Sequence, residues 1–339
     1  LYTSGTTGTP KGVCLSYGNL RSNALDCIKM ARLTEEHRFL GVLPLFHSFG
    51  LTAMLHAPVA AGAGVHYLPR YSPIGMIQAI RDQRSSVLMA ISSMYAALLR
   101  VKSACADDVK SLVYPMSGGE ALPDQVFRAF KERFDIEILQ GYGMTETSPV
   151  ISLNTPWEHR AGSIGRPIPN VAVQVRDDDG APAPTGGTGE LWVRGPGVMQ
   201  GYFNNPVETA AVKMPDGWLK TGDMGRVDDD GYVWITGRKK EMIIVGGENV
   251  YPREIENVLA DHPAVAEAAA IGRQDATRGE TVVAFVTCKQ DASVSDVELR
   301  EFCRGKLAGY KIPRRVIVRD DLPRGPTGKI LKRKLNELL

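Results

Sequence analysis

Strand-like apolar runs alternate with helical periods across residues 12–134, and this alternation constrains the fold more than any other feature. Residues 42–43 and 87–91 are predicted strands, and residues 76–81 predict part of a helix. Alternation of this kind indicates an α/β architecture with functional loops at strand ends. With 339 residues, of which 43% are hydrophobic, the chain can build a large core and two domains.

A clear helix is predicted after Pro123, because a proline near its start precedes a one-sided apolar pattern. That pattern comprises Val126, Phe127, Phe130 and Phe134. Residues 136–139 then predict a short buried strand that leads into a loop at 140–143. The helix and the strand extend the α/β pattern.

The character of the chain changes twice more. Residues 164–235 hold short alternating segments, such as 171–175 and 190–193, separated by Gly, Pro and Asp turns, which indicates a β-rich region. Beyond residue 237 a compact α/β unit is predicted. Its elements are a helix at 252–259, strands at 265–271 and 281–288, a helix from Ser295 and a strand at 315–318. Ser295 and Glu298 are predicted to form a capping box at the start of the second helix.

Composition excludes several classes of function. The formal net charge is only +2 and aromatic residues are sparse at 7%, so neither a nucleic-acid surface nor a base-stacking platform is indicated. The most apolar stretch, 51–65, is interrupted by His56, Pro58 and glycines and is too short to span a membrane. Five scattered cysteines indicate free thiols in a reducing cytosol rather than disulfides or a zinc site: Cys14, Cys27, Cys105, Cys288 and Cys303.

The chain begins inside a loop with catalytic character, without an initiator Met or a signal-peptide pattern. We therefore expect it to be part of a longer protein, and targeting cannot be inferred from this end.

The loop from Thr3 to Gly12 combines several groups that handle phosphate. Its glycines allow the backbone N–H groups to approach an anion, its four threonines and one serine donate hydrogen bonds, and Lys11 adds a positive charge for the β- and γ-phosphates. It is not a Walker A loop, because Pro10 stands where that motif has glycine before lysine. The alternative is a flexible polar turn.

Five segments in order resemble motifs of the adenylate-forming superfamily, which contains acyl-CoA synthetases, peptide-synthetase adenylation domains and firefly-type luciferases. They are residues 2–12, 140–147, 221–223, 237–238 and 323–329. The match covers essentially the whole chain, and the family's N-terminal part would lie upstream of Leu1. The resemblance implies a truncated AMP-binding adenylation domain at 1–237, made of mixed sheets flanked by helices with a small β-rich subdomain. It also implies a small mobile α/β domain at 238–339.

The resemblance also implies roles for individual residues. Tyr142 would lie against adenine, Glu146 would bind Mg²⁺ on the phosphates, and Asp223 with Arg238 would hold the ribose. The alternatives are a core aromatic for Tyr142, a solvated surface charge for Glu146 and a turn residue for Asp223. The complete ATP/AMP-binding prediction is Thr3, Ser4, Gly5, Thr6, Thr7, Lys11, Gly118, Gly119, Glu120, Gln140, Gly141, Tyr142, Gly143, Thr145, Asp223 and Arg238.

Lys329, Thr145 and His47 are the predicted catalytic residues. Attack of a carboxylate on the α-phosphate brings two anions together, and a cation at Lys329 that touches both would stabilise the transition state. The alternative for Lys329 is that residues 324–334 form only a basic tail.

The segment 45–50 discriminates within the family. Amino-acid-activating members have Asp where His47 stands, and His47 cannot supply that permanent negative charge to an ammonium group. With Phe46, Phe49, Leu51 and Met54 around it, the segment resembles that of fatty acyl-CoA synthetases and predicts a fatty acid as substrate. A role for His47 as a core histidine remains an alternative.

The resemblance makes Lys240 the hinge between two half-reactions and places Gly246 and Gly247 beside a channel for the pantetheine arm of CoA. An ordinary Gly-Gly turn is equally compatible with the latter pair. The predicted function is an AMP-forming acid–CoA ligase that uses ATP and Mg²⁺, in the cytoplasm. Transfer to an acyl carrier protein and a non-catalytic nucleotide-binding relic remain alternatives. A homodimer is left open, as is proximity to a membrane if the acid is long-chain.

Overall fold

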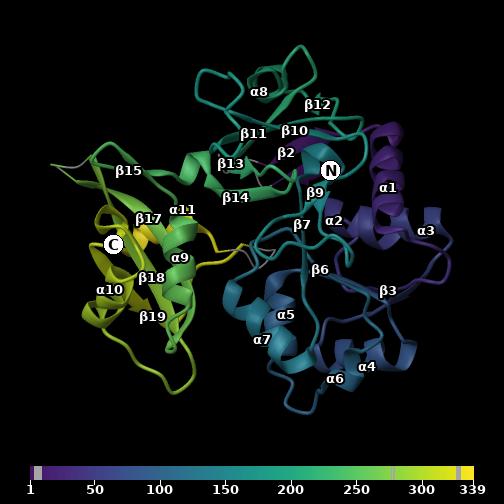
Figure 1. Ribbon diagram of the computed structural model, residues 1–339, viewed down its shortest axis with the longest axis horizontal. Coiled ribbons are helices and arrows are strands. Elements are labelled where there is room, and N and C mark those ends of the chain that lie inside the picture. Colours follow the sequence, from purple (N-terminus) through teal and green to yellow (C-terminus); the bar gives the residue numbers. More distant parts are fainter. Residues whose placement is uncertain (4–9, 276, 278, 326–329) are drawn as a thin grey trace. The chain divides into compact units, whose positions relative to one another are not determined.

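The computed structural model describes residues 1–3, 10–275, 277, 279–325 and 330–339 (Figure 1). The chain forms two compact units. Unit 1 comprises residues 1–122, 126–221 and 225–235, and unit 2 comprises residues 123–125, 222–224 and 236–339.

A seven-stranded sheet is the centre of unit 1. Its first five strands run parallel and the last two pairings are antiparallel. Parallel strands need crossover helices, which explains the β/α alternation in the sequence. The strand order is β4 (Gly64–Tyr67), β3 (Arg38–Gly41), β5 (Val87–Ala90), β6 (Tyr114–Ser117), β7 (Leu139–Gly143), β8 (Val150–Leu153) and β9 (Arg166–Pro167).

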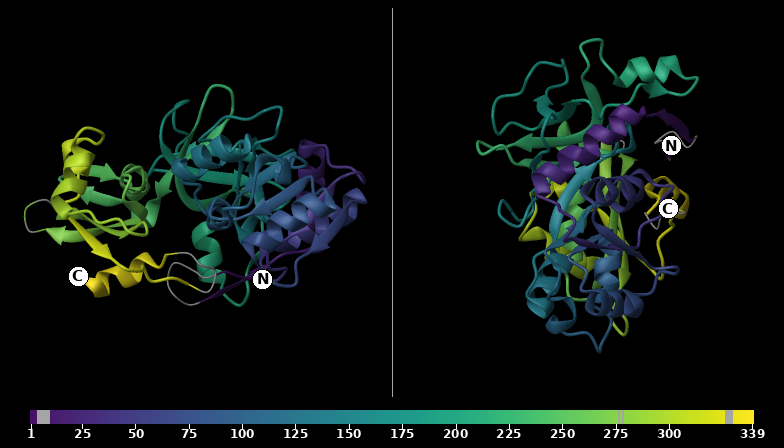
Figure 2. Two further views of the ribbon diagram at one scale, coloured as in Figure 1. Left: turned by 90° about the horizontal axis from the view of Figure 1, so that it is seen from below. Right: turned by 90° about the vertical axis from the view of Figure 1, so that its right-hand side faces the viewer.

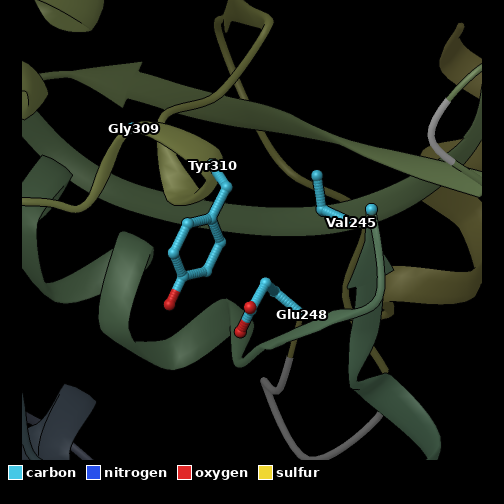
Figure 3. A pocket seen from close by; sticks show the side chains of 5 residues that line it. Val245, Glu248, Gly309 and Tyr310 are labelled. Atoms are coloured by element: carbon cyan, nitrogen blue, oxygen red, sulfur yellow. The ribbon is translucent and has the colours of Figure 1, made fainter.

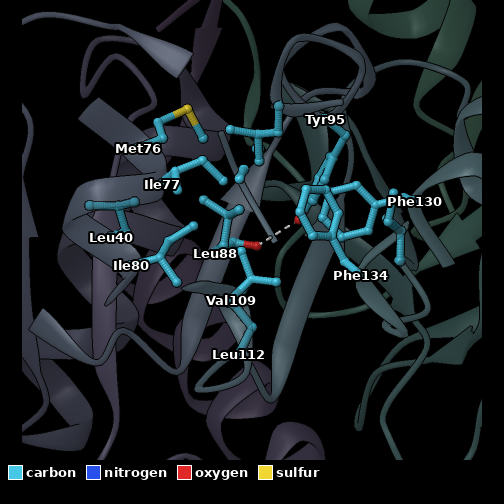
Figure 4. Close-up of a cluster of buried hydrophobic side chains, with 14 of the residues drawn as sticks. Leu40, Met76, Ile77, Ile80, Leu88, Tyr95, Val109, Leu112, Phe130 and Phe134 are labelled. Carbon is cyan, nitrogen blue, oxygen red and sulfur yellow. Dashed lines mark hydrogen bonds between the residues drawn. The ribbon is translucent and has the colours of Figure 1, made fainter. Parts of the chain in front are cut away.

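Successive strand residues point to opposite sides of this sheet, so both of its faces carry apolar side chains. Helices cover both faces. Leu40 and Leu88 face a cluster that also contains residues of α4 (Pro73–Gln83), α5 (Ser92–Leu98), α6 (Ala106–Val109) and α7 (Asp124–Phe134) (Figure 4). Their neighbours Phe39 and Val87 face α1 (Tyr17–Ala31) and α3 (Ala57–Ala61). Within the first cluster, the fully buried Tyr95 donates its hydroxyl to the carbonyls of Leu88 and Met116, so the phenol is satisfied.

Two smaller sheets lie wholly or mainly in unit 1. One has the order β1 (Tyr2–Thr3), β2 (Lys11–Cys14) and β12 (Gly201–Tyr202), with α8 (Pro206–Val212) following it in sequence. A four-stranded sheet contains β10 (Ala172–Arg176), β11 (Gly189–Arg194), β13 (Leu219–Val227) and β14 (Val233–Arg238). The short helix α2 (Ser48–Leu51), a π-helical turn η1 (Thr52–His56) and α3 follow one another, and a 3₁₀ turn η2 (Thr145–Thr147) follows β7.

Unit 2 is a five-stranded sheet with helices on both faces. The path β16 (Glu248–Val250), β15 (Ile243–Val245), β18 (Gly279–Cys288) and β17 (Val265–Asp275) is joined by β19 (Arg315–Arg319), which pairs with β18. Helices α9 (Pro252–Ala260) and α10 (Asp296–Arg304) share one apolar cluster. Leu335 of helix α11 (Lys332–Leu335) packs into the cluster on the other face. Figure 2 shows this helix in yellow, close to the C-terminus. Two 3₁₀ turns, η3 (Lys239–Glu241) and η4 (Gly309–Lys311), and the terminal η5 (Asn336–Leu338) complete it.

The α/β fold class is confirmed, and the helices predicted after Pro123, at 252–259 and from Ser295 are present as α7, α9 and α10. The Ser295 hydroxyl accepts from the Glu298 N–H at 3.2 Å, as a helix cap does.

Two predicted strands are wrong in position. Residues 42–43 follow a strand instead of forming one, because it is Phe39 and Leu40 that are inserted into the two cores. Residues 136–138 also lie outside a strand, while 140–143, predicted as a loop, belong to β7. Pairing with β8 extends the strand through both glycines, and such pairing depends on tertiary contact rather than on local propensity.

In the described part of the chain, we find no helix with both the length and the apolar character needed to cross a bilayer.

Candidate active site

The ends of the predicted phosphate loop are held together as a small hairpin. Thr3 pairs with Lys11 in the register between β1 and β2. The predictions for Ser4, Gly5, Thr6 and Thr7 lie outside the described residues.

Lys11 lies among charged and aromatic neighbours from a different part of the chain. Its ammonium group forms an ion pair with Glu208 of α8 and lies 5.1 Å from the centre of the Tyr202 ring. Tyr202 reaches this place because β12 pairs with β2, with Tyr202 opposite Val13. The Lys11 side chain is 14% exposed, so its charge is partly desolvated but balanced by Glu208.

Glu146 is buried, with 6% of its surface exposed, so it is not the solvated surface charge that the alternative proposed. Its Oε1 accepts a hydrogen bond of 2.8 Å from the Tyr202 hydroxyl. Burial and the neighbouring Glu146 charge raise the pKa of Tyr202, which keeps the phenol protonated as the donor.

The buried carboxylate of Glu146 suits the predicted Mg²⁺. Mg²⁺ prefers hard oxygen ligands and usually keeps several waters, binding through one or two carboxylates plus substrate phosphates. Among the residues that the structure describes, no group of three or more His, Cys, Asp or Glu could hold a metal by itself. The donor set therefore fits Mg²⁺ shared with a nucleotide rather than a closed protein site.

The predicted acid segment and the predicted nucleotide segment touch. The hydroxyl of Ser48, in α2, lies 3.1 Å from the hydroxyl of Thr145 in η2. One turn further on, Thr52 donates to the carbonyl of Ser148 at 3.0 Å. Two hydroxyl contacts thus connect the helical residues 48–52 to residues 145–148.

Phe49 of the same acid segment lies against predicted nucleotide residues. A Cβ added to Gly118 would lie 3.2 Å from the Phe49 ring and 3.5 Å from the carbonyl oxygen of Gly141, and one on Gly119 would lie 3.8 Å from the ring. The absence of a side chain at Gly118 lets Phe49 approach. The packing thereby brings 45–50, 118–119 and 140–147 into one region of unit 1.

His47 is exposed, so the alternative of a core histidine is wrong. Its Nδ1 accepts the N–H of Phe49 at 3.2 Å, which places the imidazole at the N-terminus of α2. Nδ1 is thus an acceptor, and a neutral imidazole here carries its proton on Nε2.

Gly143, the residue after Tyr142, has a structural requirement for glycine. A Cβ on Gly143 would lie 2.1 Å from the carbonyl oxygen of Pro149, so this position requires glycine for close backbone approach. Tyr142 itself lies in strand β7, not in a loop, and is half-buried against the cluster that contains Ile164 and Leu191.

Two other residues predicted to bind the nucleotide form hydrogen bonds with other groups of the protein. Gln140 is buried, and its carbonyl accepts from the backbone N–H and the side-chain Nδ2 of Asn154 at 2.9 and 3.0 Å. Glu120 accepts from the Ser92 hydroxyl at 2.7 Å and from the Ser93 N–H at 3.0 Å, and so caps α5. The nucleotide role of these two residues remains a prediction.

The predicted ribose residues pair with each other in unit 2. Asp223, 3% exposed, accepts from Nε of Arg238 at 3.0 Å, while the Arg238 side chain is half exposed. Arg253 of α9 lies near this carboxylate. Burial lowers the pKa of Arg253, and the charges of neighbouring carboxylates, including Asp223, oppose that effect.

Gly246 and Gly247 connect β15 and β16 as a two-residue hairpin turn with positive φ at both positions, 61° and 89°. A Cβ on either would meet nothing within 4 Å. Gly246 also lines a pocket of about 420 Å³ together with Val245, Glu248, Gly309 and Tyr310 (Figure 3). These glycines form a turn, as one alternative held, and that turn borders open space. The predicted hinge, Lys240, is exposed in η3.

Lys329 lies outside the described residues, but the base of its loop does not. Arg324 and Ile330 form an antiparallel bridge, and the N–H of Leu331 donates to the carbonyl of Pro323 at 2.7 Å. Ile330 packs on the cluster that contains Leu322 and Leu335.

Sequence reasoning missed Tyr202, Glu208 and Ser48. Tyr202 and Glu146 are 56 positions apart, and no local pattern links them. Ser48 lies inside the segment used for substrate inference, yet only its contact with Thr145 distinguishes it from other small polar residues.

The chain is similar to known CoA ligases. The chain is 39% identical to a long-chain-fatty-acid–CoA ligase of Bacillus subtilis over 99% of its own length and 60% of that protein's. It is also 39% identical to an indoleacetate–CoA ligase of Aromatoleum aromaticum, over 100% of its own length and 66% of that protein's. The chain thus spans less than two thirds of the length of these relatives.

Solved structures are similar over the whole chain. ATP-bound MatB from Rhodopseudomonas palustris has a TM-score of 0.95 and 35% identity, over 100% of this chain and 67% of that one. The o-succinylbenzoate CoA synthetase of Bacillus subtilis, in complex with the acyl-adenylate intermediate OSB-AMP, has a TM-score of 0.90 and 36% identity, over 99% and 68%. The family model for AMP-binding enzymes matches residues 1–203, and that for the AMP-binding enzyme C-terminal domain matches 254–329. The chain therefore belongs to the AMP-binding enzyme family.

Proposed function

We propose that this protein is an AMP-forming acid–CoA ligase. In the first half-reaction a carboxylate oxygen attacks the α-phosphate of ATP, giving acyl-AMP and pyrophosphate. In the second, the thiol of CoA attacks the acyl carbon and AMP leaves, giving a thioester. The observation that carries the proposal is the contact between the predicted acid segment and the predicted nucleotide segment, through Ser48 with Thr145 and Phe49 with the glycines.

The charges near the phosphate loop suit the first step. Lys11 would exchange Glu208 for the β- and γ-phosphates, which are stronger anionic partners. Glu146 would hold Mg²⁺, which neutralises charge on the phosphates when bound. Tyr202 would fix one carboxylate oxygen of Glu146 and leave the other for the metal.

Asp223 would hold the ribose. Its carboxylate can accept from both ribose hydroxyls, while Arg238 holds it in place and compensates its burial. The proposed role of Lys329, stabilising the charge that develops on the phosphoryl oxygens, comes from its motif alone.

A fatty acid is the proposed substrate. An amino acid is disfavoured because His47, rather than Asp, stands at the discriminating position, and the nearby residues Phe49 and Met54 are apolar, with Met54 fully buried. Relatives at similar identity are named for long-chain fatty acids, indoleacetate, sulfoacetate and 2-succinylbenzoate. An acid panel is therefore the necessary test.

CoA is the proposed acceptor. The turn at Gly246 and Gly247 borders a pocket and offers backbone without side chains, which suits a thin thiol arm. The cytoplasmic location and the hinge at Lys240, which the family resemblance implies, remain predictions, and a homodimer stays open.

The test is acid-dependent ATP–pyrophosphate exchange by the full-length protein with a panel of fatty, aryl and amino acids. We expect exchange with fatty acids, and a loss of about a hundredfold or more after Lys329→Ala. Absence of exchange with every acid would indicate a nucleotide-binding relic. Comparing thioester formation with free CoA and with a phosphopantetheinylated carrier protein identifies the acceptor.

A further inference from the structure

Three basic residues follow the loop of the predicted catalytic lysine, and the structure separates the first from the others. Arg333 and Lys334 are exposed, whereas the Lys332 side chain is 24% exposed and enters a charged cluster. The sequence alone gives no reason to distinguish Lys332 within this basic run.

The ammonium group of Lys332 bridges two carboxylates from separate elements. It lies 2.6 Å from Oε2 of Glu241 in η3 and 2.8 Å from Oε1 of Glu256 in α9. Glu256 also accepts the N–H of Ala270 at 2.8 Å, so it is fixed to strand β17. Burial acts to lower the pKa of Lys332, but Glu256 and Glu241 outweigh it and raise the pKa, so the lysine stays charged.

The same short segment closes the loop before it. The bridge between Arg324 and Ile330 and the bond from Leu331 N–H to Pro323 O form its base. Arg324 also forms an ion pair with Glu267 of β17. Lys332 is one residue beyond Leu331, so its position limits where the base of the loop can lie.

Glu241 directly follows Lys240, the predicted hinge. A single lysine therefore connects the base of the loop that carries Lys329 to the segment that contains the hinge. Without the lysine, two partly buried carboxylates lose their shared counter-ion, which leaves uncompensated charge.

We propose that Lys332 is a positioning residue for the first half-reaction, holding the base of the 324–330 loop to Glu241 beside the hinge and to Glu256. This inference rests on the proposed ligase function. Because small misplacements of a reacting group reduce rate strongly, loss of the bridge should affect the step that uses the loop.

The experiment compares Lys332→Met with Arg333→Met, which removes the same charge from an exposed neighbour, in the full-length protein. Acid-dependent ATP–pyrophosphate exchange reports the first half-reaction, and thioester formation from synthetic acyl-AMP and CoA reports the second. For Lys332→Met we expect kcat of exchange to fall by at least about tenfold with KM for ATP within about twofold, and the second step to fall by less than about threefold. Arg333→Met should match the wild type in both.

Amide hydrogen exchange gives a readout that does not depend on activity. The hydrogen-exchange rate of the Leu331 N–H should rise at least about tenfold in Lys332→Met and should not change in Arg333→Met. Lys332→Arg keeps the charge and should restore most of the protection. If Lys332→Met does not fold, Lys332→Arg and Glu241→Gln replace it in the comparison.

An unchanged Leu331 exchange rate in Lys332→Met, or in Glu241→Gln if Lys332→Met does not fold, would overturn the proposal. Equal losses in both half-reactions would also overturn it. If the wild type shows no exchange with any acid, the ligase function fails, and the role of Lys332 in catalysis fails with it. The Leu331 rate then still decides whether Lys332 fixes the loop base.

Discussion

The hydroxyl of Tyr202 donates a 2.8 Å hydrogen bond to Oε1 of the buried Glu146, and the ammonium group of Lys11 lies 5.1 Å from the centre of the same ring. One tyrosine thus links the residue predicted to bind metal to the lysine predicted to bind phosphate. Strand pairing between β2 and β12 creates this link.

Tyr202→Phe should weaken both stability and nucleotide use. A hydrogen bond to a charged group contributes about 1.5–3 kcal/mol, and its loss leaves a buried carboxylate oxygen without a donor. We expect a decrease in unfolding free energy of about 1–2 kcal/mol in urea, and an increased KM for Mg·ATP in exchange assays. Tyr17→Phe makes the same change at an 80% exposed ring and should do neither. Equal values for the two variants would show that the bond is unimportant.

Glu208→Gln should lower KM for ATP, because Lys11 would no longer exchange a carboxylate partner for phosphate. Glu208 is 41% exposed, so the gain should be modest, about two- to fivefold. Lys11→Met should raise the same KM. Glu132→Gln, an exposed change on α7, is the control. An increase in KM for ATP after Glu208→Gln would mean that Glu208 orients Lys11 rather than competes for it.

Gly143→Ala should destabilise unit 1 strongly. The added Cβ would lie 2.1 Å from the Pro149 carbonyl oxygen, so the β7–β8 connection must shift, at a cost of about 2 kcal/mol or more. Gly18→Ala, in α1, meets only the Ser16 hydroxyl at 3.5 Å and should be neutral or stabilising by up to about 1 kcal/mol. Urea unfolding of both variants measures the difference, and a Gly143→Ala protein as stable as the wild type would contradict the close approach.

The contribution of Asp228 to the free energy of unfolding should be lost at acid pH. Burial acts to raise its pKa, but bonds from Trp234, the Tyr232 N–H and Arg160 outweigh it and lower the pKa below the ordinary value of 3.8. Because the folded pKa is lowered, the stabilisation is complete above the ordinary pKa of the unfolded chain. It is lost as the pH falls through the folded pKa.

The stability difference between the wild type and Asp228→Asn should thus be constant from pH 7 to about 5 and shrink below about pH 4. Asp229→Asn, at an exposed neighbour, should give a difference near zero throughout. Urea unfolding at several pH values tests this, and a difference for Asp228→Asn that does not vary with pH would refute the role of its ionisation.

Local sequence was sufficient for the α/β class and for the amphipathic helices. In α7, Phe130 and Phe134 recur at helical spacing and are both buried. Spacing of this kind is a property of a short segment, so it can be read without knowing the partner. Strands were harder: residues 42–43 are as apolar as the actual strand β3, and only the pairing with β4 and β5 selects Arg38–Gly41.

The motifs at 2–12, 140–147, 221–223, 237–238 and 323–329 identified the family from the sequence, because each is a short local pattern. What only the tertiary structure decided is which side chains meet: Tyr202 with Glu146, Ser48 with Thr145, and Lys332 with Glu241 and Glu256. These partners are far apart in the chain, and their contacts follow from strand pairing and helix packing. The sequence thus determined the chemical groups available, and the fold decided which of them act together.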